Sequence, residues 1–108
     1  MPLFMVKKEV FGWVKSGQKT VEVRRGNARR GEEAVFQCGS NILRLQIAKK
    51  ETGRLDEIVR QDNFKAIIPS AKSVEEALEY LKSLYDSTEG LFTAYYLSCN
   101  SDEHLNSK

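Results

Sequence analysis

Three charged side chains, Lys19, Glu22 and Arg24, stand close together in the segment SGQKTVEVRR, which covers residues 16–25. From Thr20 to Arg24 the residues alternate with period two, which predicts a strand with valines on one face and polar side chains on the other. Neighbours on one strand face lie about 6.5 to 7 Å apart, so the Glu22 carboxylate can reach Arg24 or Lys19. Such a cluster could bind a ligand, or it could be a solvated face with an ion pair worth under about 1 kcal/mol.

Arginines follow this strand at high density. The segment RRGNARRG contains no acidic residue, and its arginines are Arg24, Arg25, Arg29 and Arg30. A guanidinium binds phosphate in a bidentate manner and stacks on bases, and a loop that contains glycine can present backbone N–H groups to an anion. The composition therefore predicts a phosphate-binding loop, although a mobile charged turn would have the same composition.

The charge is distributed unevenly along the chain of 108 residues, whose net charge is only +2. Residues 1–31 contain eight Lys or Arg and two acidic residues, whereas residues 32–108 contain nine and thirteen. The first part therefore carries a charge of +6 and the second a charge of −4. We expect a basic region that faces away from an acidic one and attracts anionic ligands.

Length and composition indicate one compact domain, which we expect over residues 1–99, followed by a polar, disordered segment over residues 100–108. No apolar run approaches the roughly 18 residues that cross a bilayer, and the first residues do not resemble a signal peptide. We therefore expect a cytoplasmic protein with no membrane partner. A monomer is favoured, and the sequence leaves the oligomeric state open. Cys38 and Cys99 are predicted to be free thiols, with a disulfide as the alternative, and no spacing predicts a metal or another cofactor. The only histidine, His104, is expected to be solvated.

The elements that must position the charged residues are mostly strands. A strand is expected at LFMV, and the apolar residues between Val6 and Val14 predict a helix that ends at Gly17. The segments AVFQC and ILRLQIAKKE predict a hairpin joined by the turn GSN. The segment LFTAYYLS has apolar residues on both faces, which predicts a central strand.

Helices are predicted in the second half of the chain. The segment RLDEIVRQ predicts a short helix, FKAIIPS an apolar connector broken by Pro69, and SVEEALEYLKSLYD a helix with capping-box spacing between Ser73 and Glu76. Strands outnumber helices, so we predict an α+β, mainly β fold. The expected architecture is a small barrel or strongly curved sheet of about five to six strands with two to three flanking helices.

The segment SGQKTVEVR resembles the Gly-x-Lys-x-x-Glu-x-Arg signature of ASCH domains, small β-barrel modules related in fold to the PUA RNA-binding domain. The matching positions are Gly17, Lys19, Glu22 and Arg24. The preceding helix, Gly31 and Phe36, the segment IIPSAKSVEEALEYLKSLY and the strand after Gly90 extend the resemblance over most of the chain. It implies a PUA-like barrel and a stand-alone ASCH protein of small size.

Two departures from the family pattern bear on the site. Where the family commonly has Gly-Asp-x-Ile-x-Phe, this chain has GEEAVF, which implies different packing at a strand entrance. In bacterial members that hydrolyse acetylated cytidine, the signature lysine works with a threonine at the position of Glu22 and with a later glutamate. This chain keeps Lys19 and lacks that threonine. Thr20, on the same strand face, could substitute for it, and Asp62 is the nearest acidic candidate for the later glutamate.

A binding module for single-stranded RNA or a nucleotide is the first functional prediction. Its cleft would be lined by Lys19, Glu22 and Arg24, with phosphates held by Arg25, Arg29 and Arg30. Aromatic side chains often stack on bases in such sites. Four are available, although each lies on an apolar stripe that more often belongs to a core: Trp13, Phe92, Tyr95 and Tyr96.

An enzyme is the alternative prediction. It would be a hydrolase acting on a modified nucleoside, similar to an acetylcytidine amidohydrolase, or a ribonuclease. Its catalytic residues would be Lys19, Glu22 and Thr20. Lys19 would then need partial burial, because burial lowers the pKa of an ammonium group toward neutral pH.

Overall fold

The structure is a computed structural model that describes residues 1–98. Its elements in chain order are β1 (Leu3–Met5), α1 (Lys8–Ser16), β2 (Val21–Arg25), β3 (Glu33–Cys38), β4 (Asn41–Arg54), α2 (Leu55–Ile58), α3 (Phe64–Ile67), α4 (Val74–Leu84) and β5 (Leu91–Leu97). The expectations for the segment 100–108, for Cys99 and for His104 lie outside the described residues.

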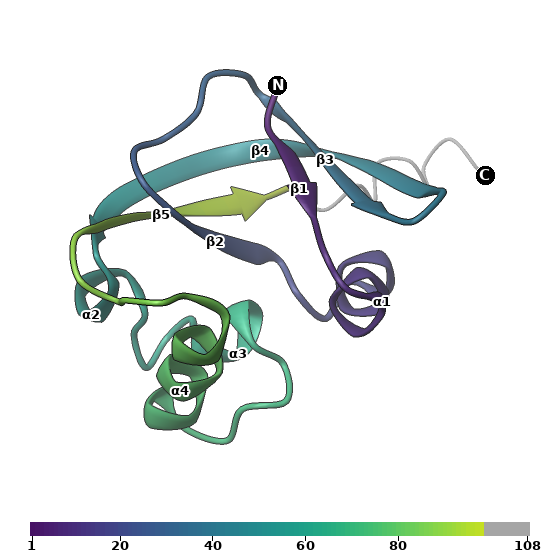
Figure 1. Ribbon diagram of the computed structural model, residues 1–108. Helices are drawn as coiled ribbons and strands as arrows, with labels where there is room; N and C mark the ends of the chain where they lie inside the picture. The colour runs from purple at the N-terminus through teal and green to yellow at the C-terminus, as the bar shows by residue number, and fades with distance from the viewer. Residues whose placement is uncertain (99–108) are drawn as a thin grey trace.

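The five strands form one mixed sheet in the order β1-β3-β4-β5-β2, curled into a half-barrel with the helices at its edges and open side (Figure 1). The predicted α+β, mainly β class is confirmed. The edge strands are β1, which pairs in parallel with β3, and β2, which pairs antiparallel with β5. In the described residues β2 has no other strand partner.

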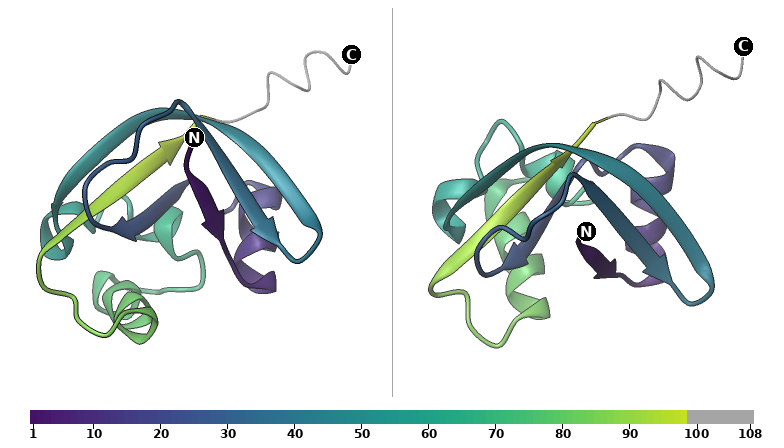
Figure 2. Two further views of the ribbon diagram at one scale, coloured as in Figure 1. Left: turned by 45° about the horizontal axis from the view of Figure 1, so that its top comes forward. Right: turned by 90° about the horizontal axis from the view of Figure 1, so that it is seen from above.

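The bend of β4 produces the curvature of the sheet. Its first part pairs with β3 and its second part with β5, and the register shifts between Ile47 and Lys49. Ala48 is therefore an extra residue on β4, and such a bulge bends a strand and increases its twist. Figure 2 shows β4 arching across the whole sheet. The predicted hairpin of β3 and β4 is confirmed.

Each part of the bent sheet covers its own group of buried side chains. Phe4, Phe36 and Val14 belong to the group under α1, where the Phe4 and Phe36 rings lie 5.3 Å apart. The other group lies under α2, α3 and α4 and includes Ile67 and Phe92. Strand β5 contributes to both groups, as expected for a central strand. Burial of each of these large side chains stabilises the fold by about 1.5 to 3 kcal/mol.

Helix α1 has the predicted pattern and end. Val10 and Val14 are its buried residues, one turn apart on the same face. Gly17 follows the helix at φ +85°, a left-handed conformation that glycine adopts without strain. This turn brings the chain back toward the sheet, so that Lys19 and Thr20 directly precede β2.

Helix α4 begins as predicted, because the Ser73 hydroxyl accepts a hydrogen bond from the Glu76 amide at 3.1 Å. The Glu76 carboxylate, however, accepts from the amide of Lys72 at 2.8 Å and not from that of Ser73. The prediction of FKAIIPS as a connector was wrong, since its first four residues form α3. The turn of helix forms because Phe64 and Ile67 both bury their side chains, and Pro69 limits its length.

Candidate functional site

A cavity of about 110 Å³ lies where β2, α1, α4 and the segment after β1 meet. The three predicted site residues Lys19, Glu22 and Arg24 all line it. Its remaining lining is apolar and aromatic except for one further lysine: Met5, Val6, Lys7, Val10, Trp13, Val23, Ile68, Tyr80, Leu81, Leu84 and Tyr85. A small apolar hollow with a few convergent charged groups is the usual form of a ligand site.

Lys19 is 4% exposed, and protein atoms take up its whole donor capacity. Its ammonium group donates to the carbonyl oxygen of Val21 at 2.8 Å and to that of Ile67 at the end of α3. The third contact is the Glu22 Oε1 atom at 3.3 Å. An ammonium group has three N–H donors. In this arrangement none is left for a ligand.

Glu22 is 6% exposed and is held between two cations. Its Oε1 faces Lys19, and its Oε2 accepts a hydrogen bond from Arg24 Nε at 2.6 Å. The contact predicted from the period-two spacing of Glu22 and Arg24 is therefore present. A carboxylate can accept about four hydrogen bonds, so each Glu22 oxygen keeps acceptor capacity. Glu22 is the fixed acceptor of the cavity.

Burial changes the pKa of several groups that line the cavity. Desolvation lowers the pKa of Lys19 below its ordinary value, and the Glu22 carboxylate partly opposes this shift. Burial also raises the pKa values of Tyr80 and Tyr85. Both phenols are therefore uncharged at neutral pH and can donate as well as accept hydrogen bonds.

Two arginines of the segment RRGNARRG contact strand β1: Arg24, predicted to line the cleft, and Arg29, predicted to hold phosphate. Arg24 Nη2 donates to the Met5 carbonyl oxygen at 3.0 Å, and Arg29 Nη1 donates to that of Leu3 at 3.1 Å. Both guanidinium groups lie against the Phe4 ring, at 4.8 and 5.3 Å from its centre. We call these two side chains the arginine clasp, because they connect the edge strand β1 with β2 and the loop that follows it.

The other two arginines of this loop differ in their contacts. Arg25 donates to the Glu89 carbonyl oxygen at 3.1 Å and lies 5.0 Å from the centre of the Phe92 ring. Arg30 is exposed and has no hydrogen bond or ion pair to another described residue. The predicted phosphate-binding loop therefore contains one arginine that is uncommitted within residues 1–98 and three that already hold parts of the chain together.

Thr20 and Asp62 are not brought to the cavity. The Thr20 backbone binds Ala66 and Leu97, and its side chain is not part of the lining. Asp62 has a side chain that is 77% exposed and pairs with Arg60 at 3.4 Å. The structure therefore gives Thr20 no place as a nucleophile beside Lys19, and it gives Asp62 no contact with the site.

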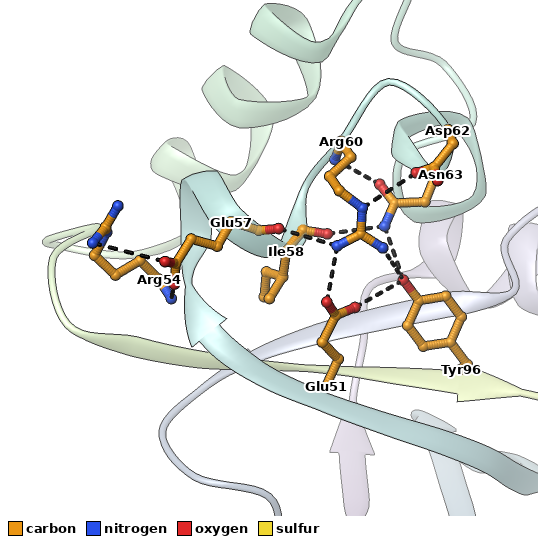
Figure 3. A network of polar contacts seen from close by, with 8 residues as sticks. All are labelled: Glu51, Arg54, Glu57, Ile58, Arg60, Asp62, Asn63 and Tyr96. Carbon is orange, nitrogen blue, oxygen red and sulfur yellow. Dashed lines mark hydrogen bonds and ion pairs between the residues drawn. The ribbon is translucent and has the colours of Figure 1, made fainter.

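Asp62 belongs instead to a polar network that joins β4, β5 and the turn before α3 (Figure 3). Arg60 binds Glu51 at 2.9 Å, and the Tyr96 hydroxyl accepts from Asn63 at 2.9 Å. The hydrogen bond from Arg60 lowers the pKa of Glu51 below its ordinary value. Asn63, which belongs to the same network, fixes the turn before α3 through the Arg60 amide and the Ile58 carbonyl oxygen.

Sequence reasoning missed most of the aromatic wall of the cavity. The Trp13 and Tyr80 rings lie 5.9 Å apart, and the Lys7 ammonium group lies 5.4 Å from the centre of the Tyr80 ring. Of the four aromatic residues considered, only Trp13 lines the cavity, whereas Phe92 and Tyr95 are core residues. An available signal was that Tyr80 and Leu84 are one turn apart at the margin of the α4 apolar stripe.

Within residues 1–98, no helix is long and apolar enough to span a membrane. No three His, Cys, Asp or Glu side chains in the same residues are placed to hold a metal ion.

Comparison with known proteins gives matches to solved structures. A scan against known protein families finds no match, and a search of curated proteins also finds none. The crystal structure of the hypothetical protein PH0355 superposes with a TM-score of 0.73 at 17% identity, covering 91% of this chain and 98% of the other. The solution structure of protein PF0455 from Pyrococcus furiosus gives 0.65 at 17% identity, covering 90% and 94%. The curled sheet with its helices is thus a fold that this chain shares with both proteins.

Proposed function

We propose that this protein is an ASCH-type, PUA-like binding module that accepts one nucleobase in the cavity beside Glu22. The base would belong to a nucleoside, a nucleotide or a single-stranded RNA. One observation carries the proposal: Lys19 and Glu22 are almost fully buried, yet both line a hollow. A buried ion pair stabilises a fold less than apolar residues of the same volume would, and buried charges in clefts mark functional sites.

The donor and acceptor pattern of the cavity indicates which ligand it would take. Since Lys19 has no free N–H, the free polar group at the centre is the Glu22 carboxylate, which accepts hydrogen bonds. Adenine, cytosine and guanine carry an exocyclic amino donor, whereas uracil does not. We therefore expect bases with an amino group to bind more tightly than uracil.

The size and walls of the cavity favour one flat nucleobase over a larger ligand. A volume of about 110 Å³ is well below the roughly 300 to 1,000 Å³ of pockets that enclose a drug-sized ligand. A base could enter beside Trp13 and Tyr80 while its sugar and phosphate stay outside. Single-stranded RNA is recognised in this way, through unstacked bases that lie against aromatic side chains.

Trp13 provides a direct measurement, because it is the only tryptophan of the chain and lines the cavity. We expect adenosine, cytidine and guanosine to quench its fluorescence in a saturable manner, and uridine to do so more weakly. Glu22→Gln should weaken binding by about tenfold or more, since it replaces a charged acceptor with an amide. Tyr80→Leu, which keeps an apolar side chain, should also weaken it.

Glu51→Gln is the matched control, because Glu51 also pairs with an arginine but lies outside the cavity. Circular dichroism establishes that each variant is folded under the conditions of the titration. Saturable quenching that is equal in the wild type, Glu22→Gln and Tyr80→Leu would exclude this cavity as the site. The absence of quenching by any nucleoside or short RNA would refute the proposal.

A hydrolase is the second candidate, and the lowered pKa of Lys19 favours it. A lysine with a lowered pKa can act as a general base. Within the described residues 1–98, however, the lining of the cavity includes no Ser, Thr or Cys side chain that could attack a substrate. Incubation with acetylcytidine, and with RNA in the presence and absence of manganese, tests this candidate. Turnover that disappears in Lys19→Ala would favour the hydrolase over the binding module.

A further inference from the structure

A second and larger hollow, of about 600 Å³, lies between α2, α4 and the segment before β5. Helix α4 contributes the stripe Glu75, Leu78, Glu79 and Lys82 to it, and the remaining lining is Arg54, Leu55, Asp56, Thr88, Glu89 and Gly90. The α4 residues that line the nucleobase cavity are Tyr80, Leu81 and Leu84. With 3.6 residues per turn, these two sets lie on opposite faces of α4. The large hollow is therefore separate from the proposed nucleobase site.

The charges around the large hollow are mainly negative. Arg54, one of its two cations, is already paired with Asp56 at 3.2 Å and with Glu57 at 3.8 Å. Glu75, Glu79 and Glu89 form no ion pair with any residue of the described part of the chain. Lys82 is the remaining cation of the lining. Of the four carboxylates that line the hollow, three are thus unpaired within residues 1–98, and Lys82 is the one cation of the lining without an ion pair there.

Leucine side chains provide the apolar part of this hollow. Leu55 is 4% exposed and belongs to the core, and Leu78 packs against the same group of core residues. A volume of about 600 Å³ is within the range of pockets that enclose a ligand the size of a few side chains. An apolar floor with a charged rim is also the composition of protein–protein interfaces, in which a few buried side chains provide most of the affinity.

We propose that this hollow docks a short basic segment of a partner protein. An apolar side chain of that segment would contact Leu55 and Leu78, and flanking Lys or Arg side chains would pair with Glu75, Glu79 and Glu89. Charge complementarity excludes the common anionic partners. A nucleic acid or an acidic membrane surface would place its phosphates against these carboxylates. The hollow thus gives the protein a second binding surface for a ligand of opposite charge to the one expected at the basic loop.

Fluorescence anisotropy with a labelled peptide tests the proposal on the full chain. The probe is a short peptide with a central leucine flanked by lysines, and the comparison peptide has glycine in place of the leucine. We expect Glu75→Gln combined with Glu79→Gln to weaken binding of the leucine peptide by about threefold to tenfold, because two ion pairs at exposed sites are lost. We expect the glycine peptide to bind about tenfold or more weakly.

The matched control is Glu32→Gln combined with Asp86→Asn, which removes the same charge from two exposed residues that do not line the hollow. It should change the affinity by less than about twofold. Equal weakening in both double variants, or equal binding of the two peptides, would mean general charge attraction and would overturn the proposal. The absence of binding by the leucine peptide would also overturn it.

Discussion

Helix α4 separates two hollows in which the same residue types have different surroundings. In the cavity beside β2, Glu22 is 6% exposed and its oxygens face Lys19 and Arg24. Around the large hollow, Glu75 and Glu79 are exposed and form no ion pair with another described residue. A buried charge must be paired for the protein to fold, whereas an exposed one contributes little to stability. Substitutions should therefore affect folding in the first region and only binding in the second.

Glu22→Ala should produce the largest loss of stability. It leaves the Lys19 ammonium group buried without its counter-charge, which costs about 3 to 5 kcal/mol in comparable buried pairs. Urea unfolding measured by circular dichroism gives the change in free energy. The double variant Lys19→Met with Glu22→Leu should recover most of the loss, since it replaces both charges with apolar groups. A loss below about 1 kcal/mol for Glu22→Ala would mean that the pair is solvated and that the contrast between the two hollows is wrong.

Substitution in the arginine clasp should cause the next largest loss of stability. Arg30, in the same loop, provides the control. Arg29→Ala removes a charged hydrogen bond to β1 and a contact with Phe4, so it should cost about 1 kcal/mol. Arg30→Ala should cost less than about 0.5 kcal/mol, because Arg30 has no such contacts within residues 1–98. The urea midpoints of the two variants test this difference. Equal losses would show that the clasp does not hold β1.

The salt dependence of the proposed RNA binding tests whether Arg24 and Arg29 stay on β1 when the ligand binds. If the clasp keeps Arg24 and Arg29 on β1, the arginines that remain for phosphates are Arg30 and, once it leaves the exposed Glu89 carbonyl oxygen, Arg25. The slope of log affinity against log salt should then be about −1.4, whereas four contacts would give about −3. Anisotropy titrations of a short labelled single-stranded RNA at several salt concentrations measure the slope. A value near that for four contacts would mean that RNA displaces the clasp.

The polar network around Arg60 should add a smaller effect that depends on pH. The pKa of Glu51 is lowered in the folded protein, so its contribution to stability is complete above the pKa of the unfolded chain. This contribution is lost as the pH falls through the lowered value. Glu51→Gln should therefore reduce the loss of stability between about pH 6 and about pH 3, measured by urea unfolding at each pH. An unchanged pH profile would show that the stability of the protein does not depend on the protonation of Glu51.

Glu75→Gln combined with Glu79→Gln should have the smallest effect on folding. Substitutions at exposed positions without structural contacts usually change stability by less than about 0.5 kcal/mol. Thermal unfolding of this double variant should therefore match that of the wild type. A clear loss of stability would mean that these carboxylates support α4, and it would remove the distinction between a folding region and a binding region.

Local patterns predicted most elements and one contact of the site. The alternation in β2 placed Glu22 beside Arg24, and the hairpin, α1 and α4 followed from periodicity and capping residues. The missed features depend on residues far apart in the chain. The Ile67 carbonyl oxygen that holds Lys19 lies 48 positions later, and Arg29 contacts Leu3 across 26 positions. No local pattern contains such contacts, because they arise only when the sheet curls.

Within the segment RRGNARRG, residues of the same type have different contacts, and the sequence alone does not distinguish them. Arg29 and Arg30 are neighbours of the same type, but only Arg29 contacts β1. The choice between them depends on the direction of each side chain relative to Phe4, which is a property of the folded loop. For the same reason, Tyr80 could be assigned to a helix from the sequence but not to the wall of a cavity.

The pairing of β2 with β5 has a consequence for how the protein is made. The strand that carries Glu22 is synthesised well before its partner at residues 91–97. A nascent chain that still lacks β5 would have no ladder to hold β2 in place. The proposed binding at Glu22 would therefore begin only after residues 91–97 have been synthesised.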